Sequence, residues 1–285
     1  MGAVKDTSYF NLFPTFFANY QASQMHNFGL SYSRRINRPS YGTLNPFEVS
    51  IDAYSFNRGN PDLTPAYTHN VELSHTFAGG LMTRIGYSST TDMIMQTSVA
   101  DDDTQRTGLS FINFGRSQQY FAMANYRRQI VKIWTANVTV QGSYLISTSN
   151  EVSGEFINQG GMFYAQLNNN ITVTPTLSAE ITGWYRSKTR QGYTVAQPQG
   201  VFSVGLRQML LKNKMTLSLT VNDIFFTSGY KGRTQYDTVN HFMDARWDSR
   251  YANLTLRYNF GSSTVRAARN KSTGIEDETT RAGGR

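Results

Sequence analysis

The sequence alternates apolar and polar residues over most of its length, and this alternation restricts the chain to β-structure. Side chains point to opposite faces along a strand, so apolar residues confined to one parity predict a sheet with one apolar face. About eleven segments show the pattern, and we therefore predict an all-β, antiparallel fold. The segments are 16–20, 28–32, 67–77, 81–87, 120–126, 134–146, 163–171, 177–185, 202–206, 215–222 and 252–260.

Composition excludes several classes of protein. The 285 residues include no cysteine, which rules out a disulfide scaffold, a thiolate metal site, an iron–sulfur cluster and a cysteine nucleophile. No stretch approaches the roughly 18 apolar residues of a transmembrane helix. A transmembrane β-barrel remains compatible, because its strands carry apolar residues only at every second position.

Two kinds of connection alternate between the predicted strands. The short ones are 21–26, 78–80, 129–132, 174–175 and 211–214, and the longer, polar ones are 35–64, 99–107, 147–154, 191–200 and 227–247. Short turns at one rim and long loops at the other are typical of outer-membrane barrels, whose turns are periplasmic and whose loops are extracellular. We expect loops 38–62 and 227–244 to provide the solute contacts of this chain.

A soluble antiparallel sandwich or barrel would also alternate. Its outer face would normally be rich in Lys and Glu, whereas the polar faces here are mostly uncharged Thr, Ser, Asn and Gln. Aromatic residues also gather at predicted strand ends, where an interfacial girdle would place them. They are Tyr20, Tyr32, Tyr87, Tyr126, Trp134, Tyr144, Tyr258 and Phe260. The pattern favours a membrane barrel over the soluble alternative.

Several sequence blocks resemble the C-terminal barrel of TonB-dependent receptor-like outer membrane proteins of the Bacteroidota type. They are LSYSRRINRPSY (30–41), LNPF (44–47), GNPDLTP (59–65), NFGRS (113–117), VNDIF (221–225) and LTLRYNFG (254–261). The resemblance implies a barrel of about 22 strands, of which this chain would form half. It also implies a signal peptide and a plug domain upstream, so we expect the chain to be incomplete.

The resemblance further implies TonB-coupled uptake of a bulky extracellular solute in the bacterial outer membrane, and no enzymatic activity. The expected partners are outer-membrane lipid, the insertion machinery and, through a plug, the TonB system. Leu254, Leu256, Tyr258 and Phe260 match the closing strand that serves as the assembly signal. An autonomous barrel or surface adhesin without transport is the alternative. We expect residues 1–261 to form the barrel segment and 262–285 a polar, disordered periplasmic tail.

Candidate chemical groups are few, and we predict no cofactor, metal or catalytic site. The acidic residues 101–103 lack the spacing of a calcium loop. His69 and His75 share a strand face but lie about 20 Å apart at the strand rise, with no third ligand. The basic run 34–38 lacks interleaved aromatics, and the net charge of +8 is scattered, so we predict no nucleic-acid binding. We expect the basic run to contact lipid headgroups or a loop carboxylate.

Charged residues also fall on polar strand faces. They are Glu72, Glu180, Arg84, Arg186, Arg207 and Arg257. Their positions are compatible with two roles. They could steer a charged solute through a lumen, or form ion pairs across neighbouring strands.

Overall fold

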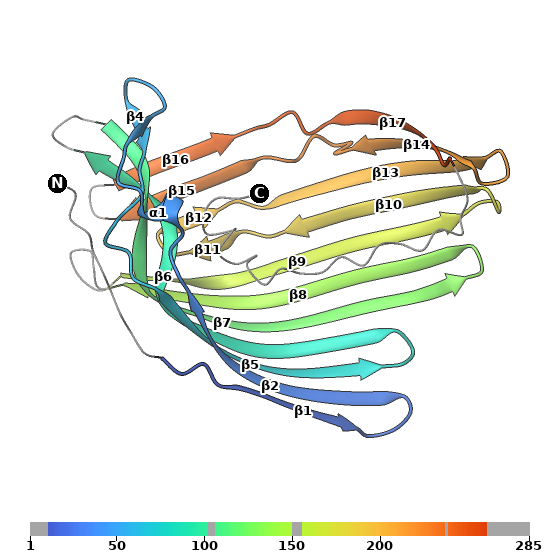
Figure 1. Ribbon diagram of the computed structural model, residues 1–285, viewed down its shortest axis with the longest axis horizontal. Helices are drawn as coiled ribbons and strands as arrows, with labels where there is room; N and C mark the ends of the chain where they lie inside the picture. The colour runs from blue at the N-terminus through green and yellow to red at the C-terminus, as the bar shows by residue number, and fades with distance from the viewer. Residues whose placement is uncertain (1–10, 102–105, 150–155, 237–238, 261–285) are drawn as a thin grey trace.

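A computed structural model of the chain describes residues 11–101, 106–149, 156–236 and 239–260. Its largest feature is a curved antiparallel sheet in which eleven described strands follow one another in chain order (Figure 1). In spatial order they are β1 (Thr15–Gln21), β2 (His26–Asn37), β5 (Ala66–Phe77), β6 (Leu81–Asp101), β7 (Arg106–Val131), β8 (Trp134–Ser149), β9 (Phe156–Thr172), β10 (Leu177–Arg186), β13 (Gln199–Leu210), β14 (Met215–Asn222) and β17 (Tyr251–Tyr258). The predicted number of strands is confirmed for this sheet.

The short connections lie together at one end of the sheet, on the right in Figure 1. β5 ends at Phe77 and β6 begins at Leu81, as the predicted turn 78–80 requires. β13 and β14 likewise flank the predicted turn 211–214, whose residues Leu211, Lys212 and Asn213 all have positive φ. The predicted turn 129–132 is displaced, because β7 continues to Val131.

The exposure of the two sheet faces is the reverse of that in a soluble protein. On β5, the apolar Val71 and Leu73 are 43% and 44% exposed, whereas Asn70, Glu72 and Ser74 between and beside them are less exposed. Leaving glycine and proline aside, eleven of the buried described residues are polar and only seven are apolar. A sheet whose apolar face turns outward and whose polar face lines the concave side accounts for this reversal.

Cross-strand register gathers the aromatics of the apolar face into a row. Tyr32 pairs with Val71, which pairs with Tyr87, and Tyr87 pairs with Tyr120, which pairs with Tyr144. The rings of Tyr87 and Tyr120 lie 4.9 Å apart. Tyr32, Tyr87 and Tyr144, which the sequence predicts for an interfacial girdle, therefore lie in one row, and the position of this row at a membrane interface stays a prediction.

Two of the predicted long connections contain strands of their own, which the sequence pattern did not predict. Segments 191–200 and 227–247 contribute to a second, four-stranded sheet in the order β11 (Thr189–Gln191), β12 (Thr194–Ala196), β15 (Tyr230–Tyr236) and β16 (Val239–Ala245). Connection 99–107 is also shorter than predicted, since β6 runs to Asp101 and β7 begins at Arg106. Pairing between distant segments, which no local pattern encodes, produces these strands.

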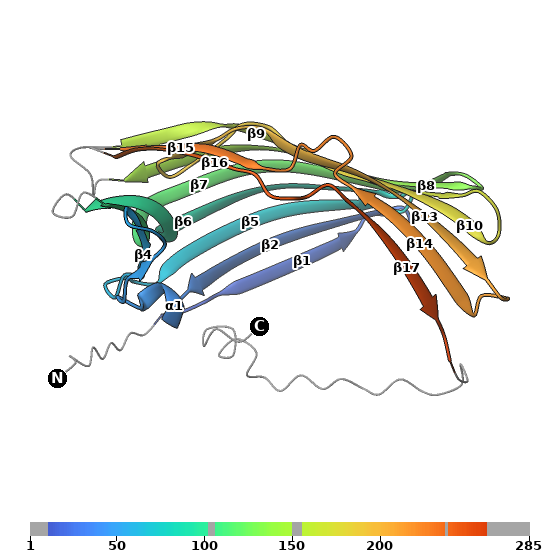
Figure 2. The same cartoon turned by 90° about the horizontal axis from the view of Figure 1, so that it is seen from above.

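The main sheet curves into a trough rather than a closed ring (Figure 2). Among the described residues, β1 pairs only with β2 and β17 only with β14. Every residue of both edge strands is exposed. The predicted tail 262–285 lies outside the described residues. Within them, no helix is long or apolar enough to span a membrane.

Candidate ligand-binding surface

The long connections converge at the end of the main sheet opposite the short turns, on the left in Figure 1. Two loop units lie there. The first follows β2 and contains α1 (Tyr41–Leu44), β3 (Val49–Ser50) and β4 (Ser55–Asn57). The second is the four-stranded sheet of β11, β12, β15 and β16, which we call the loop sheet. Together they form the candidate ligand-binding surface.

Asn113 fastens the first loop unit to the main sheet. Its side-chain amide accepts from the Thr64 amide at 2.8 Å and donates to the Thr64 carbonyl at 2.9 Å. It also donates to the carbonyl of Asp92 at 2.8 Å, where positive φ interrupts the pairing of β6 with β7. The blocks 59–65 and 113–117, which are far apart in sequence, are therefore in direct contact.

Block 59–65 also contacts block 44–47. The amide of Gly59 donates to the carbonyl of Asn45 at 2.8 Å, and the amide of Asn60 donates to the carbonyl of Thr43 at 2.7 Å. A Cβ at Gly59 would lie 2.5 Å from that Asn45 carbonyl oxygen, so only glycine permits the approach. These blocks have a structural role, because they hold the path of the chain from α1 back to β5.

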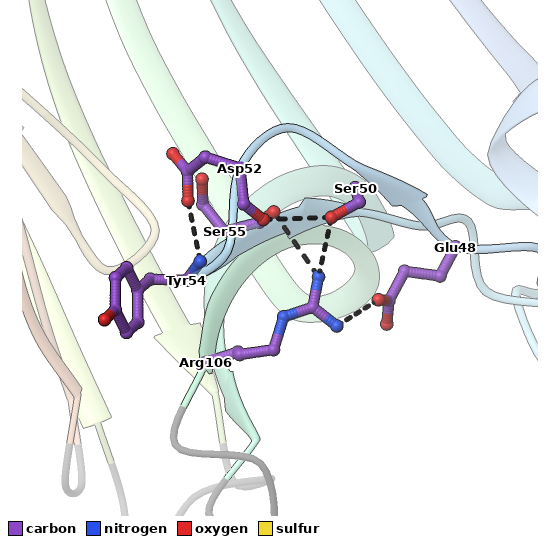
Figure 3. A network of polar contacts seen from close by, with 6 residues as sticks. All are labelled: Glu48, Ser50, Asp52, Tyr54, Ser55 and Arg106. Carbon is purple, nitrogen blue, oxygen red and sulfur yellow. Dashed lines mark hydrogen bonds and ion pairs between the residues drawn. The ribbon is translucent and has the colours of Figure 1, made fainter.

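Arg106, at the start of β7, holds the β3–β4 hairpin (Figure 3). Its guanidinium pairs with the Glu48 carboxylate and donates to Ser50 Oγ at 3.2 Å. It also lies 5.1 Å from the ring centre of Phe56, which is fully buried beside Gly108. A Cβ at Gly108 would come within 2.5 Å of that ring. Charge pairing, cation–π contact and close packing together fix the hairpin.

The β11–β12 hairpin packs against the ends of β8 and β9. The amide of Gly192 donates to Ser147 Oγ at 3.3 Å, and the Tyr193 hydroxyl donates to Ser149 Oγ at 3.1 Å. Asn158 Nδ2 donates to the Gly192 carbonyl at 2.8 Å. Ser147, Ser149 and Asn158 are buried, so the hairpin covers part of the polar sheet face.

The β15–β16 hairpin completes the loop sheet and reaches β6. Thr194 and Thr234 share a hydrogen bond of 2.8 Å between their hydroxyls, where β12 pairs with β15. On β16, His241 Nδ1 lies 2.6 Å from Ser98 Oγ of β6. The loop sheet therefore bridges strands β6, β8 and β9 at the loop end.

Aromatic rings form a small core beneath the loop sheet. Tyr193 stacks on Tyr236 at 4.1 Å between ring centres and meets Phe156 and Phe114 edge-on at 4.7 and 4.8 Å. Both Tyr193 and Phe114 are buried. A packed aromatic core indicates that the segments of the loop sheet pack together as one unit rather than as independent loops.

A basic cleft of about 560 Å³ lies between β9 and the loop sheet. Its lining includes Lys188, Arg190 and Arg233, none of which we singled out from the sequence. Arg186, Lys188 and Arg190 follow one another at every second position, and this spacing is a signal that would have found two of them. Arg233 lies in β15, for which the sequence shows no clear alternation.

One of the two roles considered for the polar-face charges is observed, at the pair Glu72 and Arg84. Arg84 Nη1 lies 3.6 Å from Glu72 Oε2, which supports ion pairing across β5 and β6. Arg186 donates instead to Gln199 Oε1 at 3.2 Å. Within the described residues Glu180, Arg207 and Arg257 make no ion pair, and a role for them in steering a solute stays a prediction.

Arg34 of the basic run makes no ion pair with a carboxylate of the described residues. Its guanidinium donates to the Leu12 carbonyl at 2.9 Å and lies 5.1 Å from the ring centre of Tyr67. It therefore ties the segment before β1 to β5. For the rest of the run, contact with lipid headgroups or with a loop carboxylate stays a prediction.

The remaining residues that the sequence pointed to are the histidines and the apolar residues of the closing strand. His75 lies against His26, with Nε2 and Nδ1 3.0 Å apart, while His69 contacts the Tyr32 hydroxyl. No cluster of three metal-ligating side chains occurs in the described part of the chain. Leu254 and Leu256 of the closing strand are 67% and 64% exposed, and the rings of Tyr258 and Phe260 lie 4.6 Å apart.

The sequence matches the model of the outer membrane protein β-barrel family over residues 2–258. No curated protein matches it. Among solved structures, the siderophore receptor PirA from Pseudomonas aeruginosa is similar, with a TM-score of 0.55 and 12% identity over 76% of this chain. A mutant of the ferric enterobactin receptor PfeA from the same organism, bound to enterobactin, gives a TM-score of 0.56 and 14% identity over 86% of this chain. The iron transporter FrpB from Neisseria meningitidis gives 0.51 and 16% over 88%.

This chain covers 39%, 40% and 39% of these three structures, so it spans about two fifths of each. At such identities the similarity shows the fold. Together with the family match, it confirms the predicted outer-membrane β-barrel class and the resemblance to TonB-dependent receptors.

Proposed function

Because the chain belongs to the outer membrane β-barrel family, we propose that it forms the loop-bearing, C-terminal part of a receptor for TonB-coupled uptake of a bulky solute. The loop end faces the cell exterior in this proposal and the short turns face the periplasm. The preceding part of the receptor supplies the plug and the strands that pair with the edges of β1 and β17. Unpaired strand edges in lipid cost several kcal/mol per unsatisfied group, so the proposal requires this pairing.

The loop sheet is the observation that carries the proposal. It joins β12 to β15 by backbone pairing and anchors them on β6, β8 and β9. A receptor that recognises a solute needs contact groups fixed above its lumen, and rigid support of such groups makes binding selective. Below the loop sheet, the polar face on the concave side of the main sheet provides a surface along which a hydrated solute can move.

Solute uptake that depends on this protein and on the proton-motive force would test the proposal. Cells with and without the gene are grown in the same complex medium, and loss of individual compounds from the medium is followed by mass spectrometry. We expect at least one compound to be depleted only when the gene is present, and an uncoupler to abolish its depletion. Gene-dependent adherence of cells without any depletion would instead support the adhesin alternative.

A further inference from the structure

The basic cleft is formed by residues from four elements of the loop end and the connection before β11. Arg190 comes from β11, Arg233 from β15, Lys188 from the connection, and Phe156 and Tyr193 line the apolar side. Its volume of about 560 Å³ is within the range of small-molecule sites. The cleft contains no carboxylate among its described lining residues.

The three cations of the cleft differ from Lys231, a cation of the same loop sheet that lies outside the cleft. Lys231, two residues before Arg233, forms an ion pair with Asp244 at 3.0 Å. No described carboxylate lies within ion-pair distance of Lys188, Arg190 or Arg233. Like charges gathered without counter-charges repel one another, and a bound anion would remove that repulsion.

Arg190 is held in place by its surroundings. Its Nη1 donates to Asn158 Oδ1 at 3.4 Å, and Asn158 is itself buried and bound to the Gly192 carbonyl. The aliphatic part of the Arg190 side chain packs against Gly160. A Cβ at Gly160 would lie only 2.7 Å from Arg190 Cδ. A fixed guanidinium presents its donors in one geometry, which suits paired oxygens of a carboxylate or phosphate.

We propose that the basic cleft binds an organic anion with at least two negatively charged oxygen groups and an apolar or ring-shaped portion. Arg190 and Arg233 hold the charged groups, and Lys188 adds a third positive charge at the rim. Tyr193 and Phe156 contact the apolar portion. This assignment rests on the proposed function for its biological role, because it makes the cleft the place where the receptor captures its solute.

Binding of benzene-1,3,5-tricarboxylate and of inositol hexakisphosphate, which are both ring-shaped polyanions, to the protein purified from outer membranes in detergent tests the site. Calorimetric titrations at physiological salt are compared with titrations of myo-inositol, which is neutral. We expect at least one anion to bind saturably and myo-inositol not to bind. The two anions distinguish a carboxylate from a phosphate ligand. Binding of neither overturns the proposal.

Substitutions then locate the site. Arg190→Gln and Arg233→Gln are each expected to weaken binding about tenfold, the effect of losing one hydrogen-bonded charge. Lys231→Gln is the matched control, because it removes a positive charge from the same strand outside the cleft, and should change affinity by less than about twofold. Equal losses in Arg233→Gln and Lys231→Gln would show that only the general charge of the loop end attracts anions, and would overturn the site.

Two further variants keep the test decisive. Lys188→Gln removes an exposed side chain that makes no hydrogen bond within the described residues, so it provides a measurement if Arg190→Gln lowers the yield of heat-modifiable barrel. Arg190→Lys should recover part of the affinity.

If uncoupler-sensitive uptake exists but no anion binds, this site is wrong and the proposed function stands. If anions bind as expected without such uptake, the proposed function is wrong and the site remains.

Discussion

Ser249 donates a hydrogen bond of 2.6 Å to the buried carboxylate of Asp223, and this contact joins the start and the end of the β15–β16 hairpin segment. Asp223 follows β14 in the block 221–225 and has positive φ. Its carboxylate also accepts from the amides of Thr227 and Ser228 at 2.9 and 2.8 Å. The segment that follows β14 and the segment that precedes β17 are therefore both bound to one carboxylate. This shared contact sets the position of the loop sheet.

The Asp223 contact predicts a dependence on acid pH. Burial raises the pKa of Asp223. Hydrogen bonds from Ser249, Thr227 and Ser228 lower this pKa by a larger amount, so that it lies below the ordinary value of 3.8 in the folded protein. A carboxyl with a depressed folded pKa stabilises the fold above its unfolded pKa, and this contribution is lost as pH falls through the folded pKa. We expect the protection factors for amide hydrogen exchange in residues 227–236 and 239–249, taken relative to the intrinsic exchange rate at each pH, to fall as the pH is lowered below about 4.

Asp223→Asn should produce the same loosening at neutral pH, because one amide oxygen cannot accept all these bonds. We expect a loss of about 1.5–3 kcal/mol in local stability, measured by hydrogen exchange at the hairpin. Asp52→Asn is the control. Hydrogen bonds from the Ser55 side chain and the Tyr54 amide lower the pKa of Asp52, yet this carboxyl is exposed in the β3–β4 hairpin. Equal effects of the two substitutions would contradict the role given to Asp223.

The orientation of the strand faces gives a second prediction. Leu256 lies on the apolar face of β17 and pairs with Leu217, whereas Thr255 pairs with Ser218 on the polar face. Arg in place of Leu256 should destabilise the barrel by roughly 2 to 4 kcal/mol at the membrane midplane, because a charge would enter lipid. Thr255→Arg should cost far less. Refolding titrations in lipid vesicles measure both, and equal tolerance would refute the assignment of faces.

The main sheet could be predicted from alternating apolar and polar residues, because the two faces of each of its strands lie in different environments. Phe77 and Leu81 could be placed on either side of a turn from the sequence alone. The loop sheet could not be predicted, because β15 and β16 are stabilised by Asp223, Thr194 and the aromatic core rather than by one apolar face. The cleft was missed for the same reason, since its cations come from segments that only tertiary pairing brings together.

Asn113 gives a third prediction, because it connects two blocks that the sequence identified without a mechanism. Asn113→Ala removes its hydrogen bonds to Thr64 and Asp92. We expect a loss of about 2–4 kcal/mol at the first loop unit, since each bond contributes about 1 kcal/mol and unpaired partners add to the cost. Faster exchange of the Thr64 amide would measure it. Asn253→Ala, which removes one weak contact at 3.4 Å, is the control and should leave Thr64 unchanged.

The proposed topology can be tested with single cysteines, because the natural chain has none. Tyr54 is 77% exposed in the β3–β4 hairpin, and Lys132 is exposed in the turn between β7 and β8. We expect an impermeant maleimide to label Tyr54→Cys on intact cells and Lys132→Cys only after the outer membrane is opened. The reverse pattern would overturn the assignment of loops to the exterior and turns to the periplasm.

The closing strand supplies the last prediction, which concerns assembly. Leu254, Leu256, Tyr258 and Phe260 form an exposed apolar row, and among the described residues β17 has a strand partner on one side only. Such an edge can pair with another sheet before its own barrel closes, which is how we propose that the insertion machinery recognises it. Tyr258→Ala with Phe260→Ala should therefore lower the amount of heat-modifiable barrel recovered from outer membranes.

Tyr251→Ala is the matched control for that double substitution, because Tyr251 begins the same strand but lies on the opposite parity, paired with Asn222. Deleting residues 262–285, which lie outside the described residues, should leave insertion intact, since their polar sequence offers no apolar row to a partner sheet. Insertion that fails on deletion of this segment and survives the double substitution would remove the assembly role from the closing strand and give it to the residues that follow.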